Sequence, residues 1–236
     1  MEQTYQEVQP WGITSYTILK DSFLSFQTKK AKIDLLTNPY FGRMLFIDGV
    51  LQSTTSDEHL YHQKMVLKGM GYRKQERILI AGGAEGALLR EIQDHDTSCD
   101  LGVKEVVMVD WDQELVEYLR DEEPWSRGSF DDERLRLVFQ NIETFLETNK
   151  QIFDTVFLDL LDPNTKEEMK WLYDIVEKSI SFLCEKGVLI MNIGSNQNRI
   201  DECILFLQGK FSQKKIEQIK IMVPSFQEIS YFISIS

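Results

Sequence analysis

Two aspartates at the end of an apolar run are of a type and spacing that could do chemistry. Asp159 and Asp162 lie three positions apart, and Pro163 follows them directly. Two carboxylates on a turn that a proline stops can hold a cationic amine and accept its proton. The pair therefore predicts general-base chemistry on an amine, although Asp162 could also serve only to begin a turn, as Asp-Pro commonly does.

A glycine-rich segment earlier in the chain predicts a site for a nucleoside. The apolar run 78–81 is typical of a buried parallel strand, and Gly82, Gly83 and Gly86 after it permit a tight turn into a helix. A second apolar run ends in Asp110, at about the 20-residue spacing where an acid accepts hydrogen bonds from ribose hydroxyls. The glycines alone would also fit an ordinary strand-to-helix turn, but the acid favours nucleoside binding.

Glu85 narrows the kind of nucleoside. The loop lacks the third glycine spacing of a dinucleotide fingerprint, and it carries Glu85 at the entrance of the helix. A carboxylate there would repel a pyrophosphate and attract a cation, which favours a sulfonium nucleoside over NAD. The alternative is that Glu85 only complements the helix dipole.

These residues need a sheet to position them, and the pattern predicts one. After about residue 72, apolar strands alternate with amphipathic helices, which is typical of an α/β Rossmann-like, doubly wound parallel sheet. We expect strands at 77–81, 105–109, 135–139, 154–158 and 187–192, helices at 86–94, 112–121, 141–148 and 165–183, and then a helix at 199–210 with an antiparallel pair at 215–222 and 229–235. We expect residues 1–65 to form a small N-terminal antiparallel β domain with a turn at Asp48-Gly49, and residues 66–236 to form the catalytic domain. Ligands of such sheets bind beyond the carboxyl ends of the strands, where Glu85, Asp110, Asn141, Asp159 and Asp162 would converge.

Composition limits the partners. A net charge of −12 and a pI near 4.8 argue against nucleic acid or an anionic membrane and would attract a cationic substrate, although acidity also serves solubility. The 236 residues show no apolar run of the roughly 18 residues that span a bilayer, and residues 1–4 do not resemble a signal peptide. We therefore expect a cytoplasmic protein. The three cysteines and three histidines lack the spacing of a disulfide framework or a metal site.

The chain resembles the polyamine aminopropyltransferase family, to which spermidine synthase belongs. The resemblance runs from Gln27 to Phe232, and its most specific segments are 41–52 (Phe-Gly-Arg-Met-Leu-Phe-Ile-Asp-Gly-Val-Leu-Gln), 57–62 (Asp-Glu-His-Leu-Tyr-His), 82–91, 109–112 and 159–163. The resemblance implies a Rossmann-like domain, decarboxylated S-adenosylmethionine as co-substrate, no prosthetic group or metal, a polyamine as acceptor and a homodimer.

The resemblance also assigns roles to individual residues. Gln27, His62 and Glu85 match positions that contact the donor, Asp110 matches the ribose-binding acid and Asn141 the adenine-binding position. Tyr61 and Asp162 match acceptor-side positions, and Asp159 matches the aspartate that accepts the proton. Three segments depart from the family: Asn141-Ile142 replaces Asp-Gly, 164–168 replaces a gate rich in glycine and proline, and Val223-Pro224-Ser225-Phe226 replaces Tyr-Pro-Ser-Gly. The last departure, with Glu85, favours a longer acceptor than putrescine, unless 223–226 is only a turn.

Two other functions stay open at this point. The same fold could carry an S-adenosylmethionine-dependent methyltransferase, but Glu85 and Asp159 would repel the carboxylate of the intact donor. Asn141 and the altered gate would also suit a non-catalytic homologue that binds a nucleoside or polyamine without turnover.

Overall fold

The protein is described here by a computed structural model covering residues 3–9 and 12–236. Its strands are β1 (Gln3–Gln9), β2 (Gly12–Ile18), β3 (Leu24–Gln27), β4 (Lys32–Asn38), β5 (Gly42–Ile47), β6 (Val50–Thr54), β7 (Arg77–Gly82), β8 (Glu105–Asp110), β9 (Leu135–Phe139), β10 (Phe153–Asp159), β11 (Leu183–Gly194), β12 (Ile216–Val223) and β13 (Glu228–Ile235). Its helices are α1 (Glu58–Met70), α2 (Ala87–Cys99), α3 (Gln113–Glu122), α4 (Ile142–Thr148), α5 (Lys166–Ser181) and α6 (Gln197–Lys210), with short 3₁₀ turns η1 (Ser129–Asp131) and η2 (Pro224–Phe226).

A seven-stranded sheet forms the centre of the larger part, in the order β12-β13-β11-β10-β7-β8-β9. The strands from β11 to β9 run parallel, whereas β13 is antiparallel to both β11 and β12. The chain moves outward from β7 to β9 on one side and then returns to β10 on the other. The point where this direction reverses lies between β7 and β10, which is where ligands of open α/β sheets bind.

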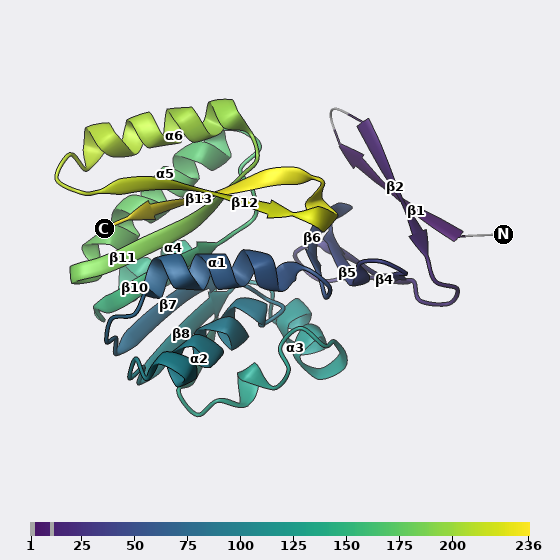
Figure 1. Cartoon of the computed structure of the whole chain (residues 1–236), viewed down its shortest axis with the longest axis horizontal. Coiled ribbons are helices and arrows are strands. Elements are labelled where there is room, and N and C mark those ends of the chain that lie inside the picture. Colours follow the sequence, from purple (N-terminus) through teal and green to yellow (C-terminus); the bar gives the residue numbers. More distant parts are fainter. Residues whose placement is uncertain (1–2, 10–11) are drawn as a thin grey trace.

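Helices cover both faces of this sheet (Figure 1). Strand β7 shows why: Ile78 and Ile80 pack in the core with α1 and α2, while Leu79 and Ala81 pack in the core with α4, α5 and α6. All four side chains are fully buried. A strand that is apolar on both sides needs a helix layer on each side, because successive side chains point to opposite faces.

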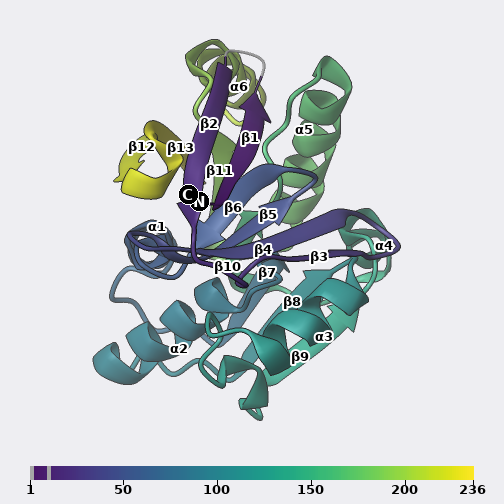
Figure 2. The same ribbon diagram turned by 90° about the vertical axis from the view of Figure 1, so that its right-hand side faces the viewer.

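Two smaller antiparallel sheets make up the N-terminal part (Figure 2). The order β3-β4-β5-β6 forms one, and the hairpin β1-β2 forms the other. The predicted turn is confirmed, since Asp48 and Gly49 both have positive φ, 50° and 82°, and join paired Ile47 and Val50. The division into two domains between residues 65 and 66 stays a prediction. Both residues lie within α1, and this helix packs on the large sheet.

The predicted elements of the large sheet are confirmed, with shifted ends. Thr165 and Asp112 cap α5 and α3, each accepting a hydrogen bond from a backbone N–H of the first turn. Helix α2 begins at Ala87 rather than at residue 86, because Gly86 has φ of 76° and lies outside the helix. Strand β11 is longer than expected and runs from Leu183 to Gly194.

A buried carboxylate joins the start of α1 to the turn between β12 and β13. Asp57 accepts hydrogen bonds from the Thr54 hydroxyl (2.6 Å), the Ser225 backbone N–H (2.8 Å) and the Ser225 hydroxyl (2.9 Å). Ser225 is fully buried. This contact holds the segment 223–226 against the helix that carries Tyr61 and His62.

Replacing Asp57 by alanine is expected to lower the free energy of unfolding by about 2–4 kcal/mol, because three buried donors lose their acceptor. Asp57→Asn keeps one acceptor oxygen and should cost less. Urea denaturation measures both values. Asp201→Ala, on an exposed part of α6, is the control. If Asp57→Ala lowers the free energy of unfolding no more than the control does, the contact contributes little to stability.

Candidate active site

The site lies where β7 and β10 end side by side. Asp159 is the last residue of β10, and it pairs with Gly82 at the end of β7. Gly82 has φ of 84°, and a Cβ there would overlap the backbone oxygen of Asp159. Glycine is therefore required for the two strand ends to approach this closely. The glycine-rich segment then turns away and carries Glu85 back above the strand ends.

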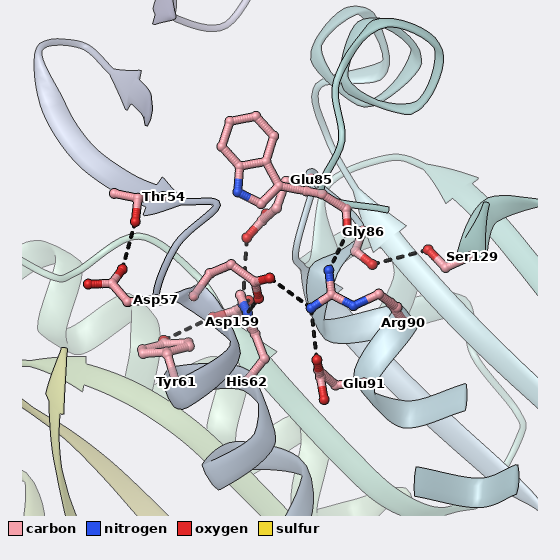
Figure 3. A network of polar contacts seen from close by, with 12 residues as sticks. Thr54, Asp57, Tyr61, His62, Glu85, Gly86, Arg90, Glu91, Ser129 and Asp159 are labelled. Atoms are coloured by element: carbon pink, nitrogen blue, oxygen red, sulfur yellow. Dashed lines mark hydrogen bonds and ion pairs between the residues drawn. The ribbon is translucent and has the colours of Figure 1, made fainter. Parts of the chain in front are cut away.

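Two residues of α1 meet Asp159. The hydroxyl of Tyr61 donates a hydrogen bond to Oδ1 of Asp159 at 3.0 Å, and Nε2 of His62 lies 3.8 Å from Oδ2. Nε2 of His62 also lies 3.5 Å from Oε1 of Glu85. Four of the predicted site residues, from three separate elements, thus form one contact group (Figure 3). Only 13% of the Asp159 side chain and 11% of the Glu85 side chain are exposed.

Burial shifts the proton affinities of this group. It raises the pKa of Glu85 to about 7, against the lowering effect of His62, and Asp159 adds to the rise. Burial likewise raises the pKa of Asp159, although the nearby His62 and the Tyr61 hydroxyl oppose the shift. Burial and the charge of Asp159 keep the pKa of Tyr61 far above its usual value. Without a cation nearby, the two carboxyl groups hold their protons unusually well.

Asp110 lies at the end of β8, as predicted, and is buried. Burial raises its pKa to about 6, while hydrogen bonds from the backbone N–H groups of Asp112 and Trp111 oppose the shift. Its Oδ1 accepts the Asp112 N–H at 2.8 Å. A buried acid at this place suits hydrogen bonds to vicinal hydroxyl groups.

Asn141 and Gln27 are not drawn into the contact group. Asn141 caps α4, and its side-chain oxygen accepts the backbone N–H of Glu143 at 2.8 Å. Gln27 is exposed at the end of β3, and its amide donates to the carbonyl of Thr28 at 3.0 Å. Their assignments to the donor stay predictions.

Asp162 lies beyond Asp159 on the segment after β10. Its side chain reaches solvent but is surrounded by protein atoms, and this partial desolvation raises its pKa to about 6 although Asn192 donates a hydrogen bond to it. Arg199 of α6 holds the segment that follows Asp162, because its guanidinium donates hydrogen bonds to the backbone carbonyls of Pro163 and Asn164. The sequence departure at 164–168 therefore gives an ordered turn that leads into the capping box of α5.

Two buried charged residues of the site did not emerge from the sequence. Glu58 accepts a hydrogen bond from Nδ1 of His62 at 2.8 Å, and the guanidinium of Arg90 donates to Glu58 at 2.8 Å. The four-residue spacing between Glu58 and His62 on one helix was the available signal. Arg90 had none, because its partner comes from a different helix.

The fold and this site define the class. The protein is an α/β protein with a Rossmann-like, methyltransferase-type sheet, a small N-terminal antiparallel sheet, and an acid-rich site at the carboxyl edge of the parallel strands. Comparison with known proteins then names the family.

The family profile described as the spermine/spermidine synthase domain matches residues 58–236, so the chain belongs to the spermine/spermidine synthase family. It is 34% identical over 203 residues to polyamine aminopropyltransferase 1 of Hyperthermus butylicus, across 82% of this chain and 67% of that protein. It is 30% identical over 193 residues to the polyamine aminopropyltransferase of Pseudomonas syringae pv. tomato, across 81% of this chain and 66% of that protein. The matched region thus spans about two thirds of these relatives. The predicted family is confirmed.

Solved structures confirm the predicted fold. Spermidine synthase from Thermotoga maritima superimposes with a TM-score of 0.81 at 21% identity, covering 99% of this chain and 79% of that one. A spermidine synthase in complex with the transition-state analogue AdoDATO gives 0.82 at 22% identity, covering 99% and 80%. Within residues 3–9 and 12–236, no helix has the length and apolar character to cross a membrane.

Proposed function

We propose that the protein is a polyamine aminopropyltransferase that moves the aminopropyl group of decarboxylated S-adenosylmethionine to an amine acceptor. The observation that carries the proposal is that three carboxyl groups, Asp159, Glu85 and Asp162, lie at this edge of the sheet. Desolvation by the surrounding protein raises the pKa of each of them. Such groups are costly to ionise alone and gain most from a bound cation. Both the donor and the acceptor of this reaction are cations.

In this reaction Asp159 acts as the general base. The acceptor amine is protonated at neutral pH and must lose a proton before its lone pair can attack. Asp159 takes that proton; the nitrogen forms a bond to the aminopropyl carbon next to the sulfonium, the carbon–sulfur bond breaks, and methylthioadenosine leaves with the electron pair. Tyr61 orients the base through its 3.0 Å hydrogen bond. Because the sulfonium is already a good leaving group, positioning supplies much of the remaining acceleration.

The donor is held by the glycine turn and its neighbours. Asp110 receives the ribose hydroxyls and Asn141 the adenine edge, while Gln27, His62 and Glu85 contact the nucleoside and aminopropyl portions of the donor. Glu85 and Asp159 also select against intact S-adenosylmethionine, because its carboxylate would face two acids. Tighter binding of intact S-adenosylmethionine than of the decarboxylated donor would favour a methyltransferase instead.

The acceptor lies on the side of Asp162 and Tyr61. The 3₁₀ turn η2 carries Phe226, whose ring centroid is 6.3 Å from that of Tyr61. This apolar ring beside Tyr61 supports an acceptor with a longer carbon chain than putrescine, such as spermidine. The protein is further proposed to be cytoplasmic, and to form a homodimer as the family resemblance implies.

A product assay tests the function. Purified protein receives decarboxylated S-adenosylmethionine with putrescine, spermidine or agmatine separately, and chromatography resolves spermine from thermospermine. Methylthioadenosine and one new polyamine are expected in equal amounts. If the donor binds by calorimetry but no acceptor reacts, the result favours the methyltransferase or the non-catalytic binding homologue instead.

Donor affinity is expected to rise with pH. Glu85 and Asp110 have folded pKa values of about 7 and 6, above those of an unfolded chain, so folding favours their protonated forms. As pH rises from about 4 towards 7, ionisation of these two groups reduces the stability of the free protein, and the ionised Glu85 gains affinity for the donor cation. The Kd of the donor should fall about 10-fold or more between pH 5.5 and 7.5, since one pKa unit corresponds to a factor of ten. Titration calorimetry measures it.

The variant Glu85→Gln separates this effect from general pH sensitivity. It should bind the donor more weakly at pH 7.5 and show a much flatter pH dependence. If the Kd of the donor for the wild-type protein stays constant from pH 5.5 to 7.5, Glu85 is not the partner of the donor cation.

A further inference from the structure

Glu58 is a buried carboxylate with both oxygens engaged. Its side chain is 3% exposed; Oε2 lies 2.8 Å from Nδ1 of His62, and Oε1 accepts a hydrogen bond from Arg90 at 2.8 Å. A carboxylate in such a place is destabilising unless it is paired and hydrogen-bonded. Glu58 makes no hydrogen bond to Asp159 or Glu85; it acts on the site through its contact with His62 and through its charge, which adds to the raised pKa of Glu85.

Arg90 braces this carboxylate. The guanidinium comes from α2, 7% of the side chain is exposed, and it also donates to Glu91 at 2.8 Å and to the backbone carbonyl of Trp125. The planar guanidinium is thereby fixed by three partners, and its charge is always present. Burial raises the pKa of Glu58, but hydrogen bonds from His62 and Arg90 outweigh burial and lower it overall.

Because Glu58 is ionised, it determines which ring nitrogen of His62 carries the hydrogen when the imidazole is neutral. A carboxylate only accepts hydrogen bonds, so Nδ1 of His62 must donate. The remaining ring nitrogen, Nε2, then faces Glu85 from the glycine turn at 3.5 Å and Asp159 from β10 at 3.8 Å. A bare lone pair on Nε2 would repel these carboxylates when they are ionised, and a proton there would attract them.

We propose that Glu58, braced by Arg90, is a positioning residue for His62. It holds a proton on Nδ1 and keeps Nε2 directed between Glu85 and Asp159. In the reaction proposed above, on which this inference rests, His62 then favours the ionised, proton-accepting form of Asp159. Burial lowers the pKa of His62, but the hydrogen bond to Glu58 and the charges of Glu85, Asp159 and Glu58 raise it overall, which agrees with this arrangement.

The test reads His62 directly by nitrogen-detected NMR of the ligand-free protein labelled with ¹⁵N-histidine. The chain has only three histidines, His59, His62 and His95, so a His62→Gln variant assigns the signal. In the wild-type protein, the His62 ring should carry its single hydrogen on Nδ1 at pH values above the raised pKa of His62, and hydrogens on both nitrogens below it. In Glu58→Gln the pKa of His62 should fall by about one unit or more, since its charged partner is gone.

Two variants control the result. Glu177→Gln removes a partly exposed carboxylate that pairs with Lys210 at 2.8 Å, and it should leave the His62 titration unchanged. Glu58→Asp keeps the charge but shortens the side chain, so it should restore part of the pKa. Thermal unfolding shows whether each variant is folded. If neither Glu58 variant folds, the residue is structural and the proposal fails.

Turnover gives a second readout. The acid limb of the kcat/KM profile should move to higher pH in Glu58→Gln, because Asp159 loses a protonated neighbour and becomes easier to protonate. A folded Glu58→Gln variant with an unchanged His62 titration would overturn the inference even if the protein transfers aminopropyl groups. A shifted titration in a protein that transfers nothing would support Glu58 as positioning residue and refute the proposed function instead.

Discussion

Asp159→Asn is expected to lower kcat for aminopropyl transfer by about 10³-fold, within the range that a general base contributes, while the Kd of the donor changes little. The amide is nearly the same size as the carboxylate, and its oxygen can still accept the 3.0 Å hydrogen bond from Tyr61. What it lacks is the ability to take the proton from the acceptor amine. Steady-state rates with saturating acceptor and donor calorimetry measure the two quantities separately.

The neighbouring acid provides the comparison. Asp162→Asn should raise the KM of the acceptor more than it lowers kcat, because Asp162 holds the amine without accepting its proton. Asp201→Asn, which removes an exposed carboxylate of α6, should change neither. Equal losses of donor affinity and turnover in Asp159→Asn would make Asp159 a donor-binding or folding residue.

Gly82→Ala is expected to cost about 3–5 kcal/mol of folding stability and to abolish activity. Two effects add: a positive φ of 84° costs roughly 1–3 kcal/mol for a residue with a Cβ, and the new methyl overlaps the backbone oxygen of Asp159. Backbone cannot rotate away as a flexible side chain can. The strand ends must therefore separate, which moves Asp159 from Tyr61 and His62.

Gly49 allows the two effects to be separated. It has nearly the same φ, 82°, but no atom lies within 4 Å of a Cβ built there. Gly49→Ala should show only the backbone strain, about 1–2 kcal/mol, with activity retained. Denaturant unfolding of both variants gives the difference. If Gly82→Ala is no less stable than Gly49→Ala, the approach of β7 and β10 leaves room for a side chain at position 82.

The strands and helices of the large sheet could be predicted because their signals are local. The run Ile78–Ala81 is apolar at every position, which requires a layer on both faces, and Thr165 and Asp112 are strong caps. The meeting of Glu85 and Asp159 followed from the rule that parallel strands present their carboxyl ends at one edge. These inferences need neither the tertiary contacts nor the exact ends of the elements.

Other features depend on contacts that no local pattern contains. Arg90 neutralises Glu58 from another helix, and Ser225 meets Asp57 across the fold. The requirement for glycine at position 82 has a similar origin, because the atom that excludes a side chain belongs to Asp159. In the sequence, Gly82 looked like any glycine of a turn. The physical reason is that these pairs are selected by packing between distant segments.

The place of β13 has a consequence for how the protein is made. Residues 228–235 lie inside the sheet, between β11 and β12, and Ser225 bonds to a residue 168 positions earlier. On the ribosome, the edge of β11 stays without its neighbour until these residues have emerged, although the rest of the sheet is already present. An unpaired edge of this kind invites pairing with other chains, and contacts of long sequence separation form slowly. Solubility during synthesis therefore depends on β13, and a variant lacking residues 228–235 is expected to aggregate rather than to remain a folded, inactive protein.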